Sequence, residues 1–276
     1  MSKLNLNELF LIHLYIMFPY TGSKKNEIKN FIDYVPDNIE NYTIVEPFGG
    51  SGAFSYYLMN QYDKINIHLN DLDKNTFNMY KMIVDNKIDE FVDTISLILN
   101  TLPEPESAKQ VEMIMNVLKK IDTVETNYIV RIIQYRPKSK TIRTGMIEKL
   151  KKQIVNKNMT IQKLTIPENT KIKLSNDDYK KVLELYKDDQ NAFIFLDPPY
   201  LSDRNNINDI YDILSFSDED FLYIRDYLKT AKCKIMIVVL NSVFMRFAFE
   251  NHIKYKYDKI YQLCKKKVEH LVITNY

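Results

Sequence analysis

One short stretch constrains the fold of this chain more than any other: an apolar run followed at once by Asp197-Pro198-Pro199-Tyr200. The run, Ala192–Leu196, is rich in aromatic and branched side chains, which predicts a strand buried on both faces, as in a parallel sheet. The two prolines end the strand because proline cannot donate a ladder hydrogen bond. Asp197 is therefore predicted at the carboxyl end of a central strand, where open α/β sheets bind their ligands.

The four residues after this strand offer a distinctive set of groups. Asp197 supplies a carboxylate, the two prolines supply a stiff backbone whose carbonyl has no competing N–H, and Tyr200 supplies a flat ring. Together they can hold a planar heterocycle that carries an amino group. The alternative at this point is a strand-ending turn capped by an aspartate.

A glycine loop follows an earlier predicted strand, Tyr42–Val45. The chain has five glycines, and three of them, Gly49, Gly50 and Gly52, lie within four positions, which indicates close approach of the backbone to a ligand. Strand, loop and the helix after it form the first βα unit of a nucleotide-type fold. Ser55 stands where the dinucleotide fingerprint has its third glycine, and Glu46 would repel a pyrophosphate, so a ligand with a cationic group is favoured.

The next predicted strand, Ile65–Leu69, ends beside two acidic residues. An acid about twenty residues past a glycine loop is where a carboxylate binds the ribose diol of a nucleotide. Asp71 is the candidate, because Asp73 is placed to cap a helix over 74–85.

A second glycine turn lies near the amino terminus, in the stretch from Tyr20 to Lys25. Lys24 stands in the first turn of an amphipathic segment and can receive a carboxylate or a phosphate there, although a simple loop-to-helix junction would look the same. The apolar run 9–18 just before it is too short to span a bilayer. We expect a soluble protein.

Cysteine and histidine usage narrows the class of protein. Two cysteines cannot build a disulfide framework and suit a reducing compartment, so a cytoplasmic location is expected. Four scattered histidines show no metal-ligand spacing, and we expect no metal site.

Positive charge is concentrated in one segment. Residues 131–163 hold ten basic residues and one acid, a local charge of +9, whereas the whole chain carries +2. Such asymmetry favours a polyanionic partner bound at one place, the alternative being a solvated, lysine-rich helical face. The candidate nucleic-acid contacts are Arg131, Arg136, Lys138, Lys140 and Arg143.

Five motifs in order then resemble the Dam-type DNA adenine methyltransferases: Tyr20-Thr21-Gly22-Ser23-Lys24, Glu46-Pro47-Phe48-x-Gly50-x-Gly52, Asn70-Asp71, Asp178-Tyr179 and Asp197-Pro198-Pro199-Tyr200. The resemblance implies an α/β, Rossmann-like methyltransferase fold with a mixed seven-stranded sheet. It divides the chain into a catalytic domain, 1–100 and 166–276, and an inserted, mostly helical, basic target-recognition region, 101–165.

The same resemblance implies S-adenosylmethionine as the methyl donor and the N6 amine of a flipped adenine in DNA as the acceptor. Tyr20 and Lys24 would lie near the methionine end of the cofactor. Glu46, Pro47, Phe48, Gly50 and Gly52 would line the cofactor, Asp71 would bind the ribose, and Asp178 with Tyr179 would bind the adenine ring. Asp197, Pro198, Pro199 and Tyr200 would be the catalytic residues, with Asp197 also beside the cofactor.

The recognition region departs from the family's pattern. We find no Asn-Arg-x-Gly or Phe-Asn-x-Pro between Asp122 and Pro167, so the target sequence is not predicted. Duplex DNA is the expected substrate, and a monomer or weak dimer the expected state. The alternatives are methylation of cytosine N4, methylation of adenine in RNA, and a non-catalytic nucleic-acid-binding relative.

Overall fold

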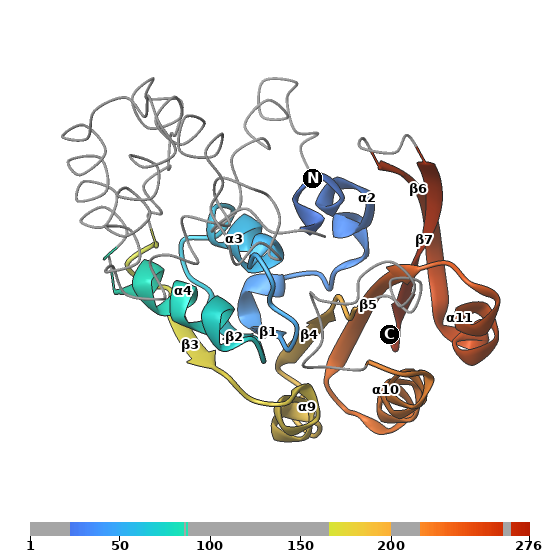
Figure 1. Cartoon of the computed structure of the whole chain (residues 1–276). Coiled ribbons are helices and arrows are strands. Elements are labelled where there is room, and N and C mark those ends of the chain that lie inside the picture. The colour runs from blue at the N-terminus through green and yellow to red at the C-terminus, as the bar shows by residue number, and fades with distance from the viewer. Residues whose placement is uncertain (1–22, 86, 88–165, 200–215, 262–265) are drawn as a thin grey trace, which may run out of the picture.

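The computed structural model describes residues 23–85, 87, 166–199, 216–261 and 266–276. Their centre is a single seven-stranded sheet covered by helices on both faces (Figure 1). The helices α2 (Ile28–Phe31), α3 (Ala53–Met59) and α4 (Lys74–Val84) pack on one face, and α9 (Tyr179–Tyr186), α10 (Asp218–Thr230) and α11 (Val243–Ala248) on the other. Four short 3₁₀ helices span Lys24–Asn26, Ile32–Tyr34, Ile39–Asn41 and Glu250–His252.

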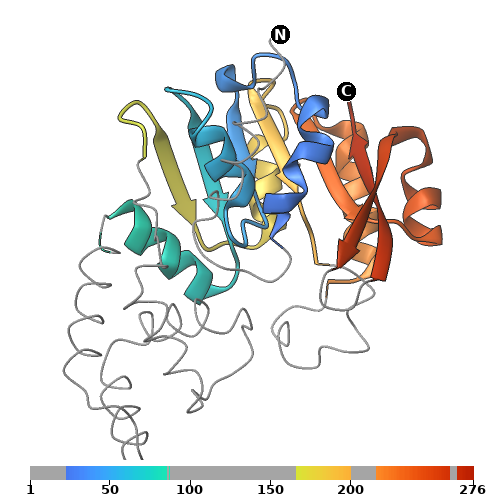
Figure 2. The ribbon, with the colours of Figure 1, turned by 90° about the horizontal axis from the view of Figure 1, so that it is seen from above.

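The strand order is β3-β2-β1-β4-β5-β7-β6, and Figure 2 shows the strands side by side in that order. Six neighbouring pairs join them: β3, β2, β1, β4 and β5 run parallel, whereas β7 is antiparallel to both β5 and β6. The bounds are β1 Thr43–Glu46, β2 Asn66–Asn70, β3 Lys171–Ser175, β4 Ala192–Leu196, β5 Lys234–Leu240, β6 Ile253–Tyr261 and β7 Lys266–Thr274. The predicted mixed seven-stranded α/β fold is confirmed.

The central strand β4 contributes side chains to both hydrophobic cores. Successive side chains point to opposite faces of a sheet, so Phe193 and Phe195 enter the core under α2, α3 and α4, and Ala192, Ile194 and Leu196 enter the other. All five are at most 2% exposed. Phe195 stacks on Phe54 at 4.3 Å between ring centroids. Full burial of one such side chain contributes about 1.5–3 kcal/mol, which explains why the apolar run was a dependable sign of a central strand.

Two helix starts are stabilised by side-chain caps. Asp73 accepts a hydrogen bond from the N–H of Asn75 and caps α4, as predicted. Ser217 and Asp220 form a reciprocal capping box at the start of α10. The amphipathic stretch after Lys24 is more broken than expected, because α2 ends at Phe31 and a 3₁₀ turn continues to Tyr34.

The apolar residues 271–273 predict a last strand, but β7 is longer than this run, and no sequence pattern predicts β6. Lys254, Lys256 and Asp258 of β6 are exposed, as suits an edge strand, which pairs on one side only. Few apolar residues are therefore needed, and the hydrophobic pattern that reveals a buried strand is weak.

Some expectations concern residues outside the described part of the chain. These are the recognition region 101–165, the stretch between 88 and 120, whose apolar spacing predicts helices, and the stretch 201–214, whose many Asn and Asp residues predict a loop. Within the described residues, no helix has the length and apolar character needed to cross a membrane.

Candidate active site

The predicted site residues meet at one edge of the sheet. β3, β2, β1 and β4 are parallel neighbours, so their carboxyl ends lie at the same edge. Asp197 follows β4, the glycine loop follows β1, Asp71 follows β2, and Asp178 follows β3. This edge is where α/β sheets bind ligands.

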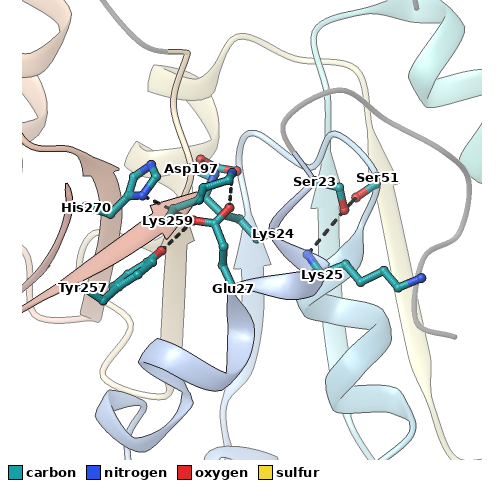
Figure 3. Close-up of polar contacts among 9 residues, drawn as sticks. All are labelled: Ser23, Lys24, Lys25, Glu27, Ser51, Asp197, Tyr257, Lys259 and His270. Atoms are coloured by element: carbon teal, nitrogen blue, oxygen red, sulfur yellow. Dashed lines mark hydrogen bonds and ion pairs between the residues drawn. The ribbon is translucent and has the colours of Figure 1, made fainter. Parts of the chain in front are cut away.

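Asp197 forms an ion pair with Lys24 from the 3₁₀ helix Lys24–Asn26 (Figure 3). The distance from Lys24 Nζ to Asp197 Oδ1 is 2.5 Å, and the two side chains are 3% and 22% exposed. Burial raises the pKa of Asp197, and the Lys24 ammonium opposes that rise. A turn-capping aspartate would need no such partner, so the pair favours the functional interpretation of Asp197 over the simple turn.

The amino-terminal turn is also tied to the glycine loop. Ser51 Oγ donates a hydrogen bond to Ser23 Oγ at 2.8 Å, and the N–H of Lys25 donates to the same Ser23 oxygen (Figure 3). The sequence placed Lys24 near a bound anion, but it gave no sign that the anion is Asp197.

The glycine loop is held by close backbone contacts. Gly50 and Gly52 have φ values of 53° and 62°, a region that favours glycine. A Cβ atom on Gly49 would lie 2.5 Å from Tyr80 Oη and 2.9 Å from the carbonyl of Asn70. The Tyr80 hydroxyl donates to the carbonyl of Gly50 at 2.7 Å. Gly49, which was not among the predicted site residues, is thus required for packing.

Glu46 turns back toward its own loop. Its Oε1 accepts a hydrogen bond from the N–H of Ser55 at 2.7 Å, and its side chain is buried. Burial raises the pKa of Glu46 to about 7, against the hydrogen bonds from Ser55 and with a further rise from the charge of Asp197. Ser55 stands where the dinucleotide fingerprint has its third glycine. Its backbone N–H therefore binds the carboxyl group of Glu46, the first residue of the glycine-loop motif.

Asp71 connects β2 to the glycine loop. Its Oδ2 accepts from the N–H of Gly50 at 2.8 Å, and its Oδ1 accepts from the N–H of Asp73 at 2.9 Å. A carboxylate has about four acceptor positions, which suits the two hydroxyls of a ribose. The position agrees with the choice of Asp71 as the ribose ligand and of Asp73 as the cap.

Asn70 joins three strand ends. It is fully buried, and its Nδ2 donates to the carbonyls of Pro47 and Asp177, both at 2.9 Å. Its Oδ1 accepts from Ser175 Oγ at 2.6 Å and from the N–H of Asp177 at 2.9 Å. The sequence analysis named Asn70 as part of a motif and gave it no role. A buried amide at a strand end, directly before an acidic ligand, is the sign that could have found it.

Phe48, Tyr179 and Phe216 form an aromatic cluster beside these strand ends. The centroid distances are 4.9 Å between Phe48 and Tyr179 and 5.5 Å from Phe216 to each of them. The Tyr179 hydroxyl donates to Asp220 at 2.7 Å. Burial and this contact raise the pKa of Tyr179. Asp178 caps α9 through Oδ1, which accepts from the N–H of Lys180 at 2.8 Å.

The remaining candidates lie outside the described residues. They are Tyr20, Tyr200, Arg131, Arg136, Lys138, Lys140 and Arg143. His68, within the described part, is buried in β2 and hydrogen-bonded to Tyr186 and Ser175, as expected of a packed strand residue. No group of three His, Cys, Asp or Glu residues arranged to hold a metal ion occurs in the part of the chain that the structure describes.

Comparison with known proteins identifies the family of this chain. The family described as D12 class N6 adenine-specific DNA methyltransferase matches residues 20–271, nearly the whole chain. The chain belongs to this family. The D12 assignment confirms the resemblance seen in the sequence and establishes the activity as methylation of adenine N6 in DNA, rather than of cytosine or of RNA.

Two curated relatives agree with the family. The type II methyltransferase M.CviBI of Paramecium bursaria Chlorella virus NC1A is 26% identical over 93% of this chain and 98% of its own length. The type II methyltransferase M.MjaIII of Methanocaldococcus jannaschii is 24% identical over 81% of this chain and 82% of its own. The D12 methyltransferase described here is thus similar to both over most of its length.

Proposed function

We propose that this D12 methyltransferase binds S-adenosylmethionine across the carboxyl ends of β1, β2 and β3 and presents Asp197 and Pro198 to the N6 amine of the target adenine. The observation that carries the proposal is the Lys24–Asp197 ion pair at the end of β4, beside the glycine loop. It places a charged hydrogen-bond acceptor at the edge where the cofactor candidates converge.

The residues present fit the cofactor that the family generally uses. The loop of Gly50 and Gly52 offers backbone without side chains, and Asp71 offers acceptors for the ribose hydroxyls. Phe48 and Tyr179 offer aromatic faces for the adenine ring. When bound, S-adenosylmethionine supplies an electrophilic methyl group on a sulfonium. The buried side chains of Lys24 and Glu46 and the backbone of Pro47 complete the candidate binding residues, with Tyr20 and Asp178.

The chemistry of the acceptor explains what Asp197 would do. The lone pair of the adenine N6 amine is delocalised into the ring, which makes the amine a poor nucleophile. Lys24 holds Oδ1 of Asp197, so Oδ2 can accept one N–H of the amine, and the carbonyl of Pro198 can accept the other. Both hydrogen bonds localise the lone pair on nitrogen and orient it for in-line attack.

The transfer balances without a further reactant. A bond would form between N6 and the methyl carbon as the bond from that carbon to sulfur breaks, leaving the sulfur as a neutral thioether. N6 would then lose one proton, for which Asp197 is the candidate acceptor. Pro199 stiffens the turn and Tyr200 would stack on the base. The base must leave the duplex, at a cost of a few kcal/mol.

The experiment is transfer of a tritiated methyl group from S-adenosylmethionine to mixed DNA and RNA, followed by nucleoside analysis. We expect N6-methyladenine in DNA. The variant Asp197→Ala should lower the rate by at least about 10²-fold, whereas Asp188→Ala, whose side chain is 76% exposed, should not change it. Parental activity in Asp197→Ala would refute the role of Asp197. Cofactor binding without any transfer would identify a non-catalytic relative.

DNA binding is assigned to the basic region within 101–165, with 1–100 and 166–276 forming the catalytic domain. Arg131, Arg136, Lys138, Lys140 and Arg143 are the proposed phosphate contacts on duplex DNA, bound by a monomer or weak dimer. Replacing one of them by alanine should weaken binding to all sequences equally and reduce the slope of log affinity against log salt by about 1. An unchanged salt slope would contradict a phosphate contact.

A further inference from the structure

A second buried acid lies on the far side of Lys24 from Asp197. Glu27 is 3% exposed, and its Oε2 accepts a hydrogen bond from the Tyr257 hydroxyl at 2.8 Å (Figure 3). Lys259 Nζ forms an ion pair with Oε1 at 2.5 Å, and His270 Nδ1 lies 3.5 Å from Oε2. Tyr257 and Lys259 belong to β6 and His270 to β7.

The four charged groups alternate in sign from the end of β4 to the hairpin. Asp197 pairs with Lys24, Lys24 shares a helical turn with Glu27, and Glu27 pairs with Lys259. The turn is closed by the N–H of Glu27, which donates to the carbonyl of Lys24 at 2.7 Å. Two carboxylates and two ammonium groups make the row neutral. We call Asp197, Lys24, Glu27 and Lys259 the charge row.

The hairpin residues are themselves held in place. Tyr257 and His270 are cross-strand partners and stack with their ring centroids 5.4 Å apart. Burial lowers the pKa of His270 to about 4, so its ring is neutral at pH 7 and adds no charge to the row. The β6–β7 pair thus presents one hydroxyl and one ammonium to Glu27 from a fixed surface.

We propose that Glu27 and Lys259 are positioning residues for methyl transfer: they hold Lys24 in place against Asp197 and thereby fix the carboxylate that receives the target amine. This inference rests on the role proposed above for Asp197. It assigns the β6–β7 hairpin a part in the reaction, although the hairpin supplies no residue to the predicted site.

Burial explains why the row needs four members. A buried charge costs several kcal/mol unless it is paired, and Lys24 is 3% exposed. With Asp197 as its one carboxylate, Lys24 would follow every movement of that side chain. Glu27, which Tyr257 and Lys259 hold from β6, is a second carboxylate whose charge interacts with Lys24, so the lysine can restrain Asp197.

The row also sets the charge balance at Asp197. Burial raises the pKa of Asp197, Lys24 and Lys259 lower it, and Glu27 raises it. Burial acts to raise the pKa of Glu27 as well, but the charges of Lys24 and Lys259 and the hydrogen bond from Lys259 oppose it, and that pKa lies below its usual value. Glu46 is a further titratable neighbour within the described residues, since the charge of Asp197 contributes to the raised pKa of Glu46.

These signs give a test that a merely structural role would not pass. Glu27→Gln removes a negative charge at nearly constant shape, so the pKa of Asp197 should fall. Lys259→Met removes a positive charge, so that pKa should rise. The double variant should return it toward the parental value. In each single variant kcat should fall by about tenfold to a hundredfold, as expected from a misplaced acceptor, with little change in the KM for the cofactor.

The direct measurement is carbon NMR of the aspartate side-chain carboxyls against pH in the protein without cofactor or DNA, with Asp197 assigned by its loss in Asp197→Asn. The acidic limb of kcat/KM should move in the same directions. Because the NMR titration needs no turnover, an inactive parent would count against the proposed function and leave this inference open to test.

The matched controls are Asp258→Asn and Lys267→Met, which break an exposed ion pair on the same hairpin. These two variants should change neither the pKa of Asp197 nor the acidic limb of kcat/KM. If Glu27→Gln does not fold, Lys259→Met carries the charge test. Tyr257→Phe removes a hydrogen bond and no charge. It should lower kcat by several-fold without shifting the acidic limb of kcat/KM. Shifts of the same sign in both charge variants, or no shift in a folded variant, would overturn the proposal.

Discussion

The edge of the sheet that carries the candidate site has two halves, and they are held together by different forces. On the cofactor side, β1, β2 and β3 are joined by neutral hydrogen bonds that converge on Asn70. On the catalytic side, β4 is joined to the amino-terminal turn and the β6–β7 hairpin by the charge row. Neutral bonds fix the backbone of the proposed cofactor site, and charges fix the carboxylate that we propose as the acceptor of the target amine.

The difference has a consequence for pH and salt. Neutral amide bonds do not titrate between about pH 4 and 9, so the hydrogen bonds around Asn70 should persist across that range. The catalytic side contains carboxylates whose protonation would change the net charge of the charge row. Because its members are buried, it should nevertheless be little affected by added salt.

The largest expected effect is that of Asn70→Ala. The change leaves several buried groups unsatisfied, including the carbonyls of Pro47 and Asp177, and each such group costs about 1–3 kcal/mol. We expect the free energy of unfolding to fall by about 4–5 kcal/mol, measured by denaturant unfolding, with weaker cofactor binding by calorimetry. Asn60→Ala, which removes an amide bond within a helix end, is the control. A similar fall in the free energy of unfolding in both variants would show that the hydrogen bonds of Asn70 do not hold the strand ends together.

Lys259→Met should have the next largest effect. It leaves the buried carboxylate of Glu27 without its ammonium partner, and breaking a buried pair costs about 3–4 kcal/mol. The loss of stability should be the same in low salt and in about 0.5 M NaCl, at which exposed charges are strongly screened. A loss that disappears in high salt would place Lys259 with the exposed pairs.

Glu46→Gln should affect stability in a way that depends on pH. The pKa of Glu46 is about 7 in the folded chain, against an ordinary value of 4.5. The folded chain therefore holds a proton that the unfolded chain has lost, and the contribution of Glu46 is greatest below pH 4.5 and is lost as the pH rises through 7. Glutamine mimics the protonated carboxyl, so the variant should gain up to about 3 kcal/mol over the parent between pH 5 and 8.

This gain is measured by thermal unfolding of parent and variant at each pH. A constant difference across the range would mean that Glu46 does not titrate there. Glu250→Gln, at an exposed position, serves as the control and should show no trend with pH.

The smallest expected effect is that of Lys267→Met, which breaks the exposed pair with Asp258. Such pairs are screened by water and salt and contribute little. We expect no measurable change in unfolding, and a clear loss would extend the charge row to the outer face of the hairpin.

Most of the parallel part of the sheet could be predicted because its strands are marked by local apolar runs. Ala192–Leu196 matches β4 at both ends, and the predicted strands 42–45 and 65–69 are each displaced by one residue from β1 and β2. A further apolar run, 235–240, predicts β5 and begins one residue late. The edge strand β6 could not be found in this way, since one side of it is polar. Its importance lies in Tyr257 and Lys259, which are ordinary residues of a charged stretch until the fold brings them to Glu27.

The sequence by itself determined where the strands end and which residues stand there, because proline, glycine and capping acids act on their immediate neighbours. It placed Asp197, Asp71 and the glycine loop at one edge, as parallel strands require. Only the tertiary structure decided what holds them. Lys24 and Asp197 are 173 residues apart, and Glu27 and Lys259 are 232 apart. Such pairs are selected by burial, since a charge removed from water must find its partner wherever the fold brings one, and no local pattern records that choice.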